Sequence, residues 1–412
     1  MLQGKQTEHT PRRPGAERTT PMKRATRLLL LAYLAFISLG LPDATFGIAW
    51  PSLRHAFALP PAAIGMVLVT GVSGYFLSGL LAGGLMGKVG VGGLLAGSSA
   101  LVALGLIGYA LAPAWSLFFP VAFFVGLGSG AIDSALNGYA SRHFSVRHVN
   151  WLHACWGVGA STGPVIMTAA IALGPGYRAG YGVIAGLLGA MTFGFVLTRR
   201  AWDQPSVADA PAPVASAPEA RGSARAALGS GRVWLLISSF FCYSGVESGV
   251  GQWCFTWLTE GRGLAVEAAG SWTSAYWASL TLGRVLFGTV AERIGPDRLL
   301  RVASVGAVGG VGLLALSAGT TGRLGLLLLG MSLAPMYPTL MARTPARVGS
   351  EHASHTVGFL VSSATLGSSL VPWLIGALVG RLGLTAIGGV TVTFGLALAA
   401  LLHFATAPEP VR

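Results

Sequence analysis

Charged residues are scarce in this chain. They make up 10% of its 412 residues, and only 14 residues are acidic, whereas an ordinary soluble domain carries about 25% charge. Hydrophobic residues make up 53%, and the mean hydropathy is +0.65. Such a composition excludes a disordered chain, a collagen-like chain and an ordinary soluble enzyme. The main solvent of this protein is therefore expected to be lipid.

Cysteine is also rare, and the sequence has no enzyme or metal motif. Cys155, Cys242 and Cys254 lie in apolar stretches, which predicts core thiols without a disulfide framework. No His/Cys set has the spacing of a zinc site, and Gly87-Lys88 lacks the flanking residues of a P-loop. We therefore expect no metal, no cofactor and no enzymatic activity. Any concentrating work must then come from an ion gradient.

Long apolar stretches, by contrast, recur along the whole chain. About 20 apolar residues suffice to cross a bilayer as a helix, and the first stretch is too long for the core of a signal peptide. The sequence thus predicts an all-α integral membrane protein with twelve transmembrane helices. Their predicted ranges are 27–50, 62–86, 92–112, 116–140, 150–172, 179–198, 233–257, 267–291, 299–318, 323–342, 354–379 and 383–405.

Basic residues divide unevenly between the two sides of these spans. If the N-terminus is cytoplasmic, 21 of the 27 Lys and Arg residues lie on the cytoplasmic side, five lie in outer loops and Arg284 lies within a span. This is the positive-inside pattern. It explains the net charge of +13 without a nucleic-acid partner. It predicts a multi-pass protein of the cell membrane, surrounded by the lipid bilayer, with both termini in the cytoplasm.

The middle of the chain differs from the rest, because residues 201–230 are rich in Pro, Ala and Ser. Such a composition is typical of a flexible linker, here between two six-helix halves. We also expect the protein to be a monomer. The predicted segments are a basic tail at 1–26, an N-terminal bundle at 27–198, a linker at 199–232, a C-terminal bundle at 233–406 and a short tail at 407–412.

A short motif occurs at the cytoplasmic end of the second span of each half. Both copies read Gly-x-x-x-x-basic-x-Gly, and they lie 205 residues apart. Internal repeats are typical of transporters whose halves rock about a central site. The motif residues are Gly83, Lys88 and Gly90 in the first copy and Gly288, Glu292, Arg293 and Gly295 in the second.

The second copy resembles the G-x-x-x-[DE]-[RK]-x-G loop signature of the major facilitator superfamily. This resemblance implies two pseudo-symmetric six-helix bundles and alternating access. In the first copy Gly87 replaces the usual acid, so we do not expect this half to make the latch that the acid makes in the family. In addition, Gly79, Gly83 and Gly87 form a stripe at i, i+4 and i+8, which predicts tight packing against a neighbouring helix.

A stretch of the fourth span is similar to the fucose-permease-like branch of that superfamily. It reads Gly128-x-Gly130-x-x-Asp133-Ser-Ala-x-Asn137. The resemblance implies a sugar:proton symporter in which Asp133 takes part in proton coupling. Asp43, however, lies about one turn away from the place of the branch's acid in the first span.

Four charges lie well inside predicted spans: Asp43, Asp133, Glu247 and Arg284. Each costs about 2.5–3.5 kcal/mol on insertion scales, so such residues normally face the interior and mark a pathway. The three acids are candidates for proton coupling. The alternatives are a polar patch that joins two spans for Asp133 and a structural ion pair for Glu247. Arg284 could instead extend toward the surface, or it could pair with a buried carboxylate or an anionic substrate.

Polar and aromatic side chains near these charges are candidates for binding a hydroxylated solute, because rings stack on a sugar while polar groups bind its hydroxyls. For the aromatic residues, packing is the alternative. The candidates are Asn137, His153, Trp156, Tyr243, Gln252, Trp253, Tyr276 and Tyr337.

Three functions remain open from the sequence. The first is a secondary transporter that moves a small, sugar-like solute together with protons, or with sodium in their place. The second is the efflux of a drug-like compound or secondary metabolite by proton antiport. The third is a membrane sensor or scaffold without transport, which would gain nothing from the cost of inserting the interior carboxylates.

Overall fold

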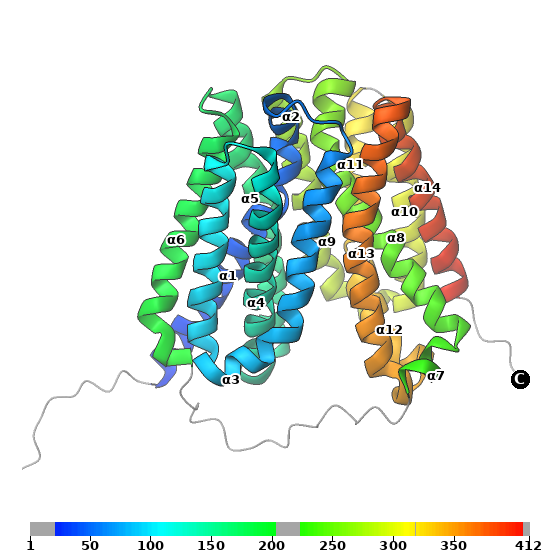
Figure 1. The fold of residues 1–412 in the computed structure, drawn as a ribbon. Helices are drawn as coiled ribbons and strands as arrows, with labels where there is room; N and C mark the ends of the chain where they lie inside the picture. Colours follow the sequence, from blue (N-terminus) through cyan, green and yellow to red (C-terminus); the bar gives the residue numbers. More distant parts are fainter. Residues whose placement is uncertain (1–20, 203–222, 318, 407–412) are drawn as a thin grey trace, which may run out of the picture.

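The structure, a computed structural model, describes residues 21–202, 223–317 and 319–406. Residues 1–20 of the predicted tail 1–26, the predicted tail 407–412 and residues 203–222 of the predicted linker 199–232 lie outside the described residues. Two groups of helices stand side by side, α1–α6 in one half and α8–α14 in the other (Figure 1). The helices of the first half are α1 (Pro21–Asp43), α2 (Thr45–Ala56), α3 (Ala63–Leu111), η1 (Trp115–Leu117), α4 (Phe118–His143), α5 (Val146–Ala172) and α6 (Gly176–Trp202).

The second half follows a short helix, α7, in the latter part of the predicted linker. The first turn of α7 is capped by Ser223, whose hydroxyl oxygen accepts a hydrogen bond from the Ala226 N–H at 3.1 Å. The helices are α7 (Ala224–Leu228), α8 (Gly231–Thr256), the π-helix η2 (Trp257–Gly261), α9 (Val266–Ile294), α10 (Pro296–Leu316), α11 (Thr320–Leu333), α12 (Met336–Val348), α13 (Ser350–Leu382) and α14 (Thr385–Ala405).

The described residues form twelve spans, which confirms the predicted fold. Ten helices, or helices joined end to end, are long and apolar enough to cross a membrane. One of them, α3, has 49 residues, about 74 Å of helix, and so it supplies two spans. The twelfth span is α9, whose 29 residues are more polar because they include Arg284 and several Ser and Thr residues.

Gly90 divides α3 into these two spans. Its φ of 75° lies in the left-handed region that favours glycine. The two legs flank α4, because Gly126 lies against the Gly71 carbonyl of the first leg and Gly128 lies against the Ser98 carbonyl of the second. The sequence therefore placed the predicted spans 62–86 and 92–112 correctly.

The first span is also interrupted. Helix α1 ends at Asp43, directly after Pro42, and α2 begins at Thr45, so that Ala44 alone separates the two helices. Proline cannot donate the backbone hydrogen bond that would continue the ladder. The Thr45 hydroxyl donates to the Pro42 carbonyl at 2.7 Å, which satisfies one of the acceptors at the break. The break, and Asp43 with it, therefore lies at mid-depth of the span, where unpaired backbone groups are costly.

We call the end of the bundle that carries Lys88, Arg142, Arg199, Arg293 and Arg343 the basic end. The chain enters α1 and α8 there and leaves α6 and α14 there. The other end, at which α2 ends and α9 begins, is called the opposite end.

The two halves meet at mid-depth and toward the opposite end. Gly47 of α2 lies so close to the Gln252 backbone of α8 that a Cβ would stand 2.5 Å from its carbonyl oxygen. Gly270 of α9 leaves no room for a Cβ beside Thr168 of α5. Arg54 and Glu260 form an ion pair between the halves at 2.7 Å. Direct packing and charge pairing thus close the opposite end.

Toward the basic end, the glycines of the stripe and Gly288 of the repeated motif have no packing neighbours among the described residues. A Cβ at Gly83, Gly87 or Gly288 would have no atom within 4 Å. The predicted tight packing of the stripe Gly79, Gly83 and Gly87 is therefore wrong for this structure, because the helix face that carries them meets no neighbour. The contacts between the halves named above lie at mid-depth and toward the opposite end, and the two groups of helices diverge toward the basic end (Figure 1).

Candidate functional site

Asp133 of α4 sits in a hydrogen-bonded polar group in the first half. Its Oδ2 accepts from the Tyr75 hydroxyl of α3 at 2.8 Å, and its Oδ1 accepts from Asn137 Nδ2 at 2.9 Å. Asn137 lies one turn further along the same helix, which explains the second contact. All three side chains are half-buried. Tyr75 was not a candidate in the sequence, since its 58-residue separation from Asp133 gave no local signal.

Asp43 lies where α1 stops, at the junction of the two halves. Its Oδ2 accepts from Trp156 Nε1 of α5 at 2.9 Å, and its backbone carbonyl accepts from Gln252 Nε2 of α8 at 3.2 Å. Asp43 is exposed although it stands at mid-depth in its span. The space between the halves is therefore accessible to water at the level of this carboxylate.

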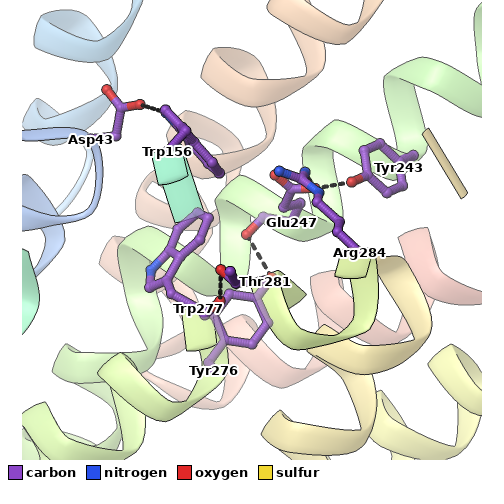
Figure 2. A network of polar contacts seen from close by, with 8 residues as sticks. All are labelled: Asp43, Trp156, Tyr243, Glu247, Tyr276, Trp277, Thr281 and Arg284. Carbon is purple, nitrogen blue, oxygen red and sulfur yellow. Dashed lines mark hydrogen bonds and ion pairs between the residues drawn. The ribbon is translucent and has the colours of Figure 1, made fainter. Parts of the chain in front are cut away.

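Glu247 and Arg284 form an ion pair in the second half (Figure 2). Arg284 Nη2 of α9 lies 3.6 Å from Glu247 Oε2 of α8, and their side chains are 23% and 13% exposed. The Tyr243 hydroxyl donates to the same carboxylate oxygen. The Tyr276 hydroxyl donates to the Glu247 backbone carbonyl at 3.0 Å. Arg284 thus pairs with a buried carboxylate, one of the alternatives that the sequence left open, instead of extending toward the surface.

Trp156 connects these two groups. The Arg284 guanidinium stands over its ring with Cζ 5.3 Å from the centroid, and the ring of Trp277 meets it edge-on at 6.1 Å. Trp156 belongs to the first half, whereas Arg284 and Trp277 belong to the second. In the sequence, Trp277 is a candidate only by its position within a predicted span. Its position became visible only from the packing of α9 beside Gly251 of α8.

The charges of this region are unbalanced. Three carboxylates, Asp43, Asp133 and Glu247, stand near one guanidinium, which pairs with Glu247. Neither Asp43 nor Asp133 makes an ion pair with a residue in the described parts of the chain. Carboxylates that lie near one another without a cation between them repel each other, and protonation of one of them relieves that repulsion. The arrangement can therefore take up protons, and it disfavours an anionic solute.

Most other candidates lie around the same space. His153 of α5 is exposed, packs edge-on against Phe36 at 5.4 Å, and lies within the electrostatic reach of Asp133 and Arg284. Tyr337 is half-buried, with its ring 5.9 Å from that of Tyr243. Gln252 is 8% exposed, and its Oε1 has no hydrogen-bond partner among the described residues. A solute hydroxyl could supply the missing donor.

Trp253 does not belong to this group. It is fully buried, and its Nε1 donates to the Pro372 carbonyl of α13 at 2.9 Å. Its indole therefore fixes the packing of α8 on α13 and is not available to a solute. Its side chain therefore points away from that of Gln252, because one residue along a helix turns a side chain by about 100°.

The repeated motif lies at the basic end, far from the carboxylates. Lys88 and Arg293 are exposed, and the side chain of Glu292 lies outside the described residues. Gly90 and Gly295 both have positive φ, 75° and 86°, so the motif glycines end one helix and allow the next to begin. Of the cysteines, Cys242 and Cys254 are buried, whereas Cys155 is only half-buried. Within the described residues no group of three or more His, Cys, Asp or Glu side chains could hold a metal ion.

Comparison with known proteins agrees with this architecture. The profile of the Major Facilitator Superfamily matches residues 32–372. The chain belongs to the Major Facilitator Superfamily. It is therefore a multi-pass membrane transporter and not an enzyme. Among curated proteins, the glucose/mannose transporter GlcP of Bacillus subtilis (strain 168) is 20% identical over 353 residues, which cover 84% of this chain and 86% of GlcP.

Several solved structures share the fold of this superfamily member. The nucleoside transporter NupG matches with a TM-score of 0.72 and 16% identity, over 93% of this chain and 98% of NupG. A bacterial homologue of the lysosomal transporter Spinster, inward-facing and unoccupied, matches with a TM-score of 0.75 and 14% identity, over 95% and 98% of the two chains. FucP in the outward conformation matches with a TM-score of 0.59 and 17% identity, over 93% and 99%.

Proposed function

We propose that this transporter is a symporter that moves a small, uncharged polar solute, sugar-like in chemistry, together with protons. The observation that carries the proposal is the pair of carboxylates Asp43 and Asp133. Asp43 lies exposed at the junction of the halves, Asp133 acts on it electrostatically, and neither carboxylate makes an ion pair with another described residue. A proton-coupled carrier needs such groups, because they can be protonated in one access state and ionised in the other.

Glu247 has a different role in this proposal, although the sequence placed it with the proton carriers. Its carboxylate is paired with Arg284 and accepts from Tyr243. Glu247 therefore holds Arg284 in place in this proposal, and Asp43 and Asp133 carry the protons.

The polar and aromatic lining supports a hydroxylated solute. Gln252 offers an unpaired acceptor, and Trp156, Trp277 and Tyr337 offer ring surfaces. The related proteins transport glucose, mannose or nucleosides, according to their names, and all of these carry several hydroxyls.

The basic end is proposed to face the cytoplasm, because basic residues are retained on that side of membranes. The structure then represents the form open to the cytoplasm, with the opposite end closed by Gly47, Gly270 and the pair of Arg54 and Glu260. Protons and solute would leave the site on the basic side.

Uptake into proteoliposomes tests this function. Radiolabelled D-glucose, L-fucose and uridine serve as probes under an imposed pH gradient, acidic outside. Symport predicts accumulation of at least one probe by the wild type, and accumulation is lost in D43N and D133N. E267Q, which removes an exposed carboxylate at the start of α9, is the matched control and should accumulate the probe like the wild type.

Other outcomes would contradict the proposal. Loss of preloaded probe under the same gradient would indicate antiport, and the absence of any flux would agree with a sensor or scaffold. Accumulation by both D43N and D133N at the wild-type level would remove these acids from proton coupling.

A further inference from the structure

The indole of Trp156 contacts charged or aromatic groups both through its N–H and through its ring. Its N–H donates to Asp43 Oδ2 at 2.9 Å, its ring face carries the Arg284 guanidinium at 5.3 Å, and the Trp277 ring meets it at 6.1 Å (Figure 2). The first contact lies within the first half, and the other two reach the second half. A change at Asp43 can therefore reach the second half through one side chain.

The contact with Arg284 depends on the charge of Asp43 for a physical reason. A guanidinium is attracted by the negative face of an indole ring. When the indole N–H donates to an ionised carboxylate, the ring becomes richer in electrons and is fixed in orientation. Protonated Asp43 is a weaker acceptor, so the ring is both less negative and less well fixed.

Arg284 is in turn anchored within its own half. It pairs with Glu247, which also accepts from Tyr243. The guanidinium therefore cannot simply follow the indole when the halves move. Any loosening of the indole weakens the contact between the halves at mid-depth.

We propose that Trp156 is a positioning residue that couples the protonation of Asp43 to the contact between the two halves. With Asp43 ionised, the indole is fixed in orientation and binds the Arg284 guanidinium of the second half on its ring face. With Asp43 protonated, this cation–π contact is weaker. This inference rests on the proposed proton coupling.

Thermodynamic reciprocity gives the consequence for transport. If ionised Asp43 strengthens a contact that exists in the form open at the basic end, then that form favours the release of the proton from Asp43. Release of the proton on the basic side is then thermodynamically linked to the contact between the Trp156 ring and Arg284. A symporter needs this directionality to discharge its protons on one side.

Other groups near Asp43 contribute to its environment. The charge of Asp133 on α4 acts on Asp43, and the Tyr75 hydroxyl of α3 lies within electrostatic reach. Gln252 of α8 binds the Asp43 carbonyl and leaves its carboxylate free. None of these side chains stacks on Arg284, so among the described residues it is Trp156 that joins the Asp43 carboxylate to the second half by direct contact.

Thermal unfolding of the purified protein in detergent tests the link without transport. Buried Cys242 and Cys254 react with a thiol-reactive dye as the protein unfolds. The measurement is made on the wild type, D43N, W156F and D43N/W156F at alkaline and acidic pH. W156F keeps a ring but loses the N–H. We expect each single variant to lower the midpoint at alkaline pH and the double variant to lower it no further.

Trp253 supplies the matched control. It is a buried tryptophan that does not contact Trp156, and its Nε1 donates to the Pro372 carbonyl of α13 at 2.9 Å. W253F should combine additively with D43N, and in W253F the unfolding midpoint should still differ between alkaline and acidic pH. If W156F is also additive with D43N, the proposed link is wrong.

A second variant covers the case in which W156F does not fold. R284K keeps the charge for Glu247 but loses the planar guanidinium that stacks on the ring. We expect R284K to be non-additive with D43N in the same way. Additivity of R284K with D43N at alkaline pH would overturn the proposal.

Transport then separates the link from the proposed function. In proteoliposomes, W156F should lower the gradient-driven accumulation of the probe by about tenfold, within the usual range of a coupling between sites, and should lower counterflow by much less. Equal losses in both assays would show a general defect and overturn the coupling role. If the wild type shows no gradient-driven accumulation, the proposed function fails, while the unfolding cycle still decides whether Trp156 links Asp43 to Arg284.

Discussion

The ion pair of Glu247 and Arg284 gives the sharpest stability prediction. Its two side chains are 13% and 23% exposed, and their charges lie 3.6 Å apart. Removing one member of a buried pair costs about 3–5 kcal/mol, because the other charge is left without a partner. Since both side chains keep some exposure and the separation is long, we expect about 2–3 kcal/mol for E247Q and for R284M.

The double variant E247Q/R284M should be much less harmful than either single variant. Neutral glutamine can still accept from Tyr243, and methionine fills the volume of the arginine stem without a charge. Replacement of a buried pair by neutral residues is often nearly neutral, so we expect a cost below about 1 kcal/mol. The resulting coupling between the two sites is at least about 3 kcal/mol.

Unfolding by SDS in mixed micelles, followed by the reactivity of the buried thiols, measures these free energies. E260Q is the matched control, since it removes one member of the ion pair with Arg54 near the surface and should cost at most about 1 kcal/mol. Single variants at Glu247 and Arg284 within about 0.5 kcal/mol of the wild type, with additive effects, would refute the burial argument.

Three further results are expected. G47A should lower the midpoint of thermal unfolding, because a Cβ would clash with the Gln252 backbone, whereas G83A should leave it unchanged because nothing lies within 4 Å. Equal midpoints for the two variants would contradict the close packing of the halves toward the opposite end. R54E and E260R should each slow transport by opening that end, and the charge-swapped double variant should recover at least part of the rate; a double variant no faster than either single variant would exclude a latch. Half-buried Cys155 should react with a polar maleimide in the native protein, while the two buried thiols stay unmodified. Mass spectrometry of the labelled peptides measures this, and an unmodified Cys155 would show that the cavity is closed.

The number of spans followed from the sequence because bilayer thickness fixes the length of an apolar helix. Local contacts also followed: Asp133 with Asn137 and Tyr243 with Glu247 are four residues apart on one helix face. Both pairs required only the helical repeat.

Contacts between helices did not follow from the sequence. Tyr75 meets Asp133 and Trp156 meets Asp43 across separations of 58 and 113 residues. These contacts depend on the rotation of each helix about its axis, and spans that are apolar all round carry little periodicity to fix it. The same reason explains Trp253, which one helical step turned away from the site and onto Pro372.

The most direct test of the account is a measurement of proton movement itself. Lightly buffered proteoliposomes are mixed with an accepted solute in the absence of a gradient, and the external pH is followed. The account predicts that the medium becomes more alkaline as protons enter with the solute, and that D43N and D133N abolish this change while E267Q retains it. Solute entry without any pH change, or with acidification of the medium, would contradict proton symport through these two carboxylates.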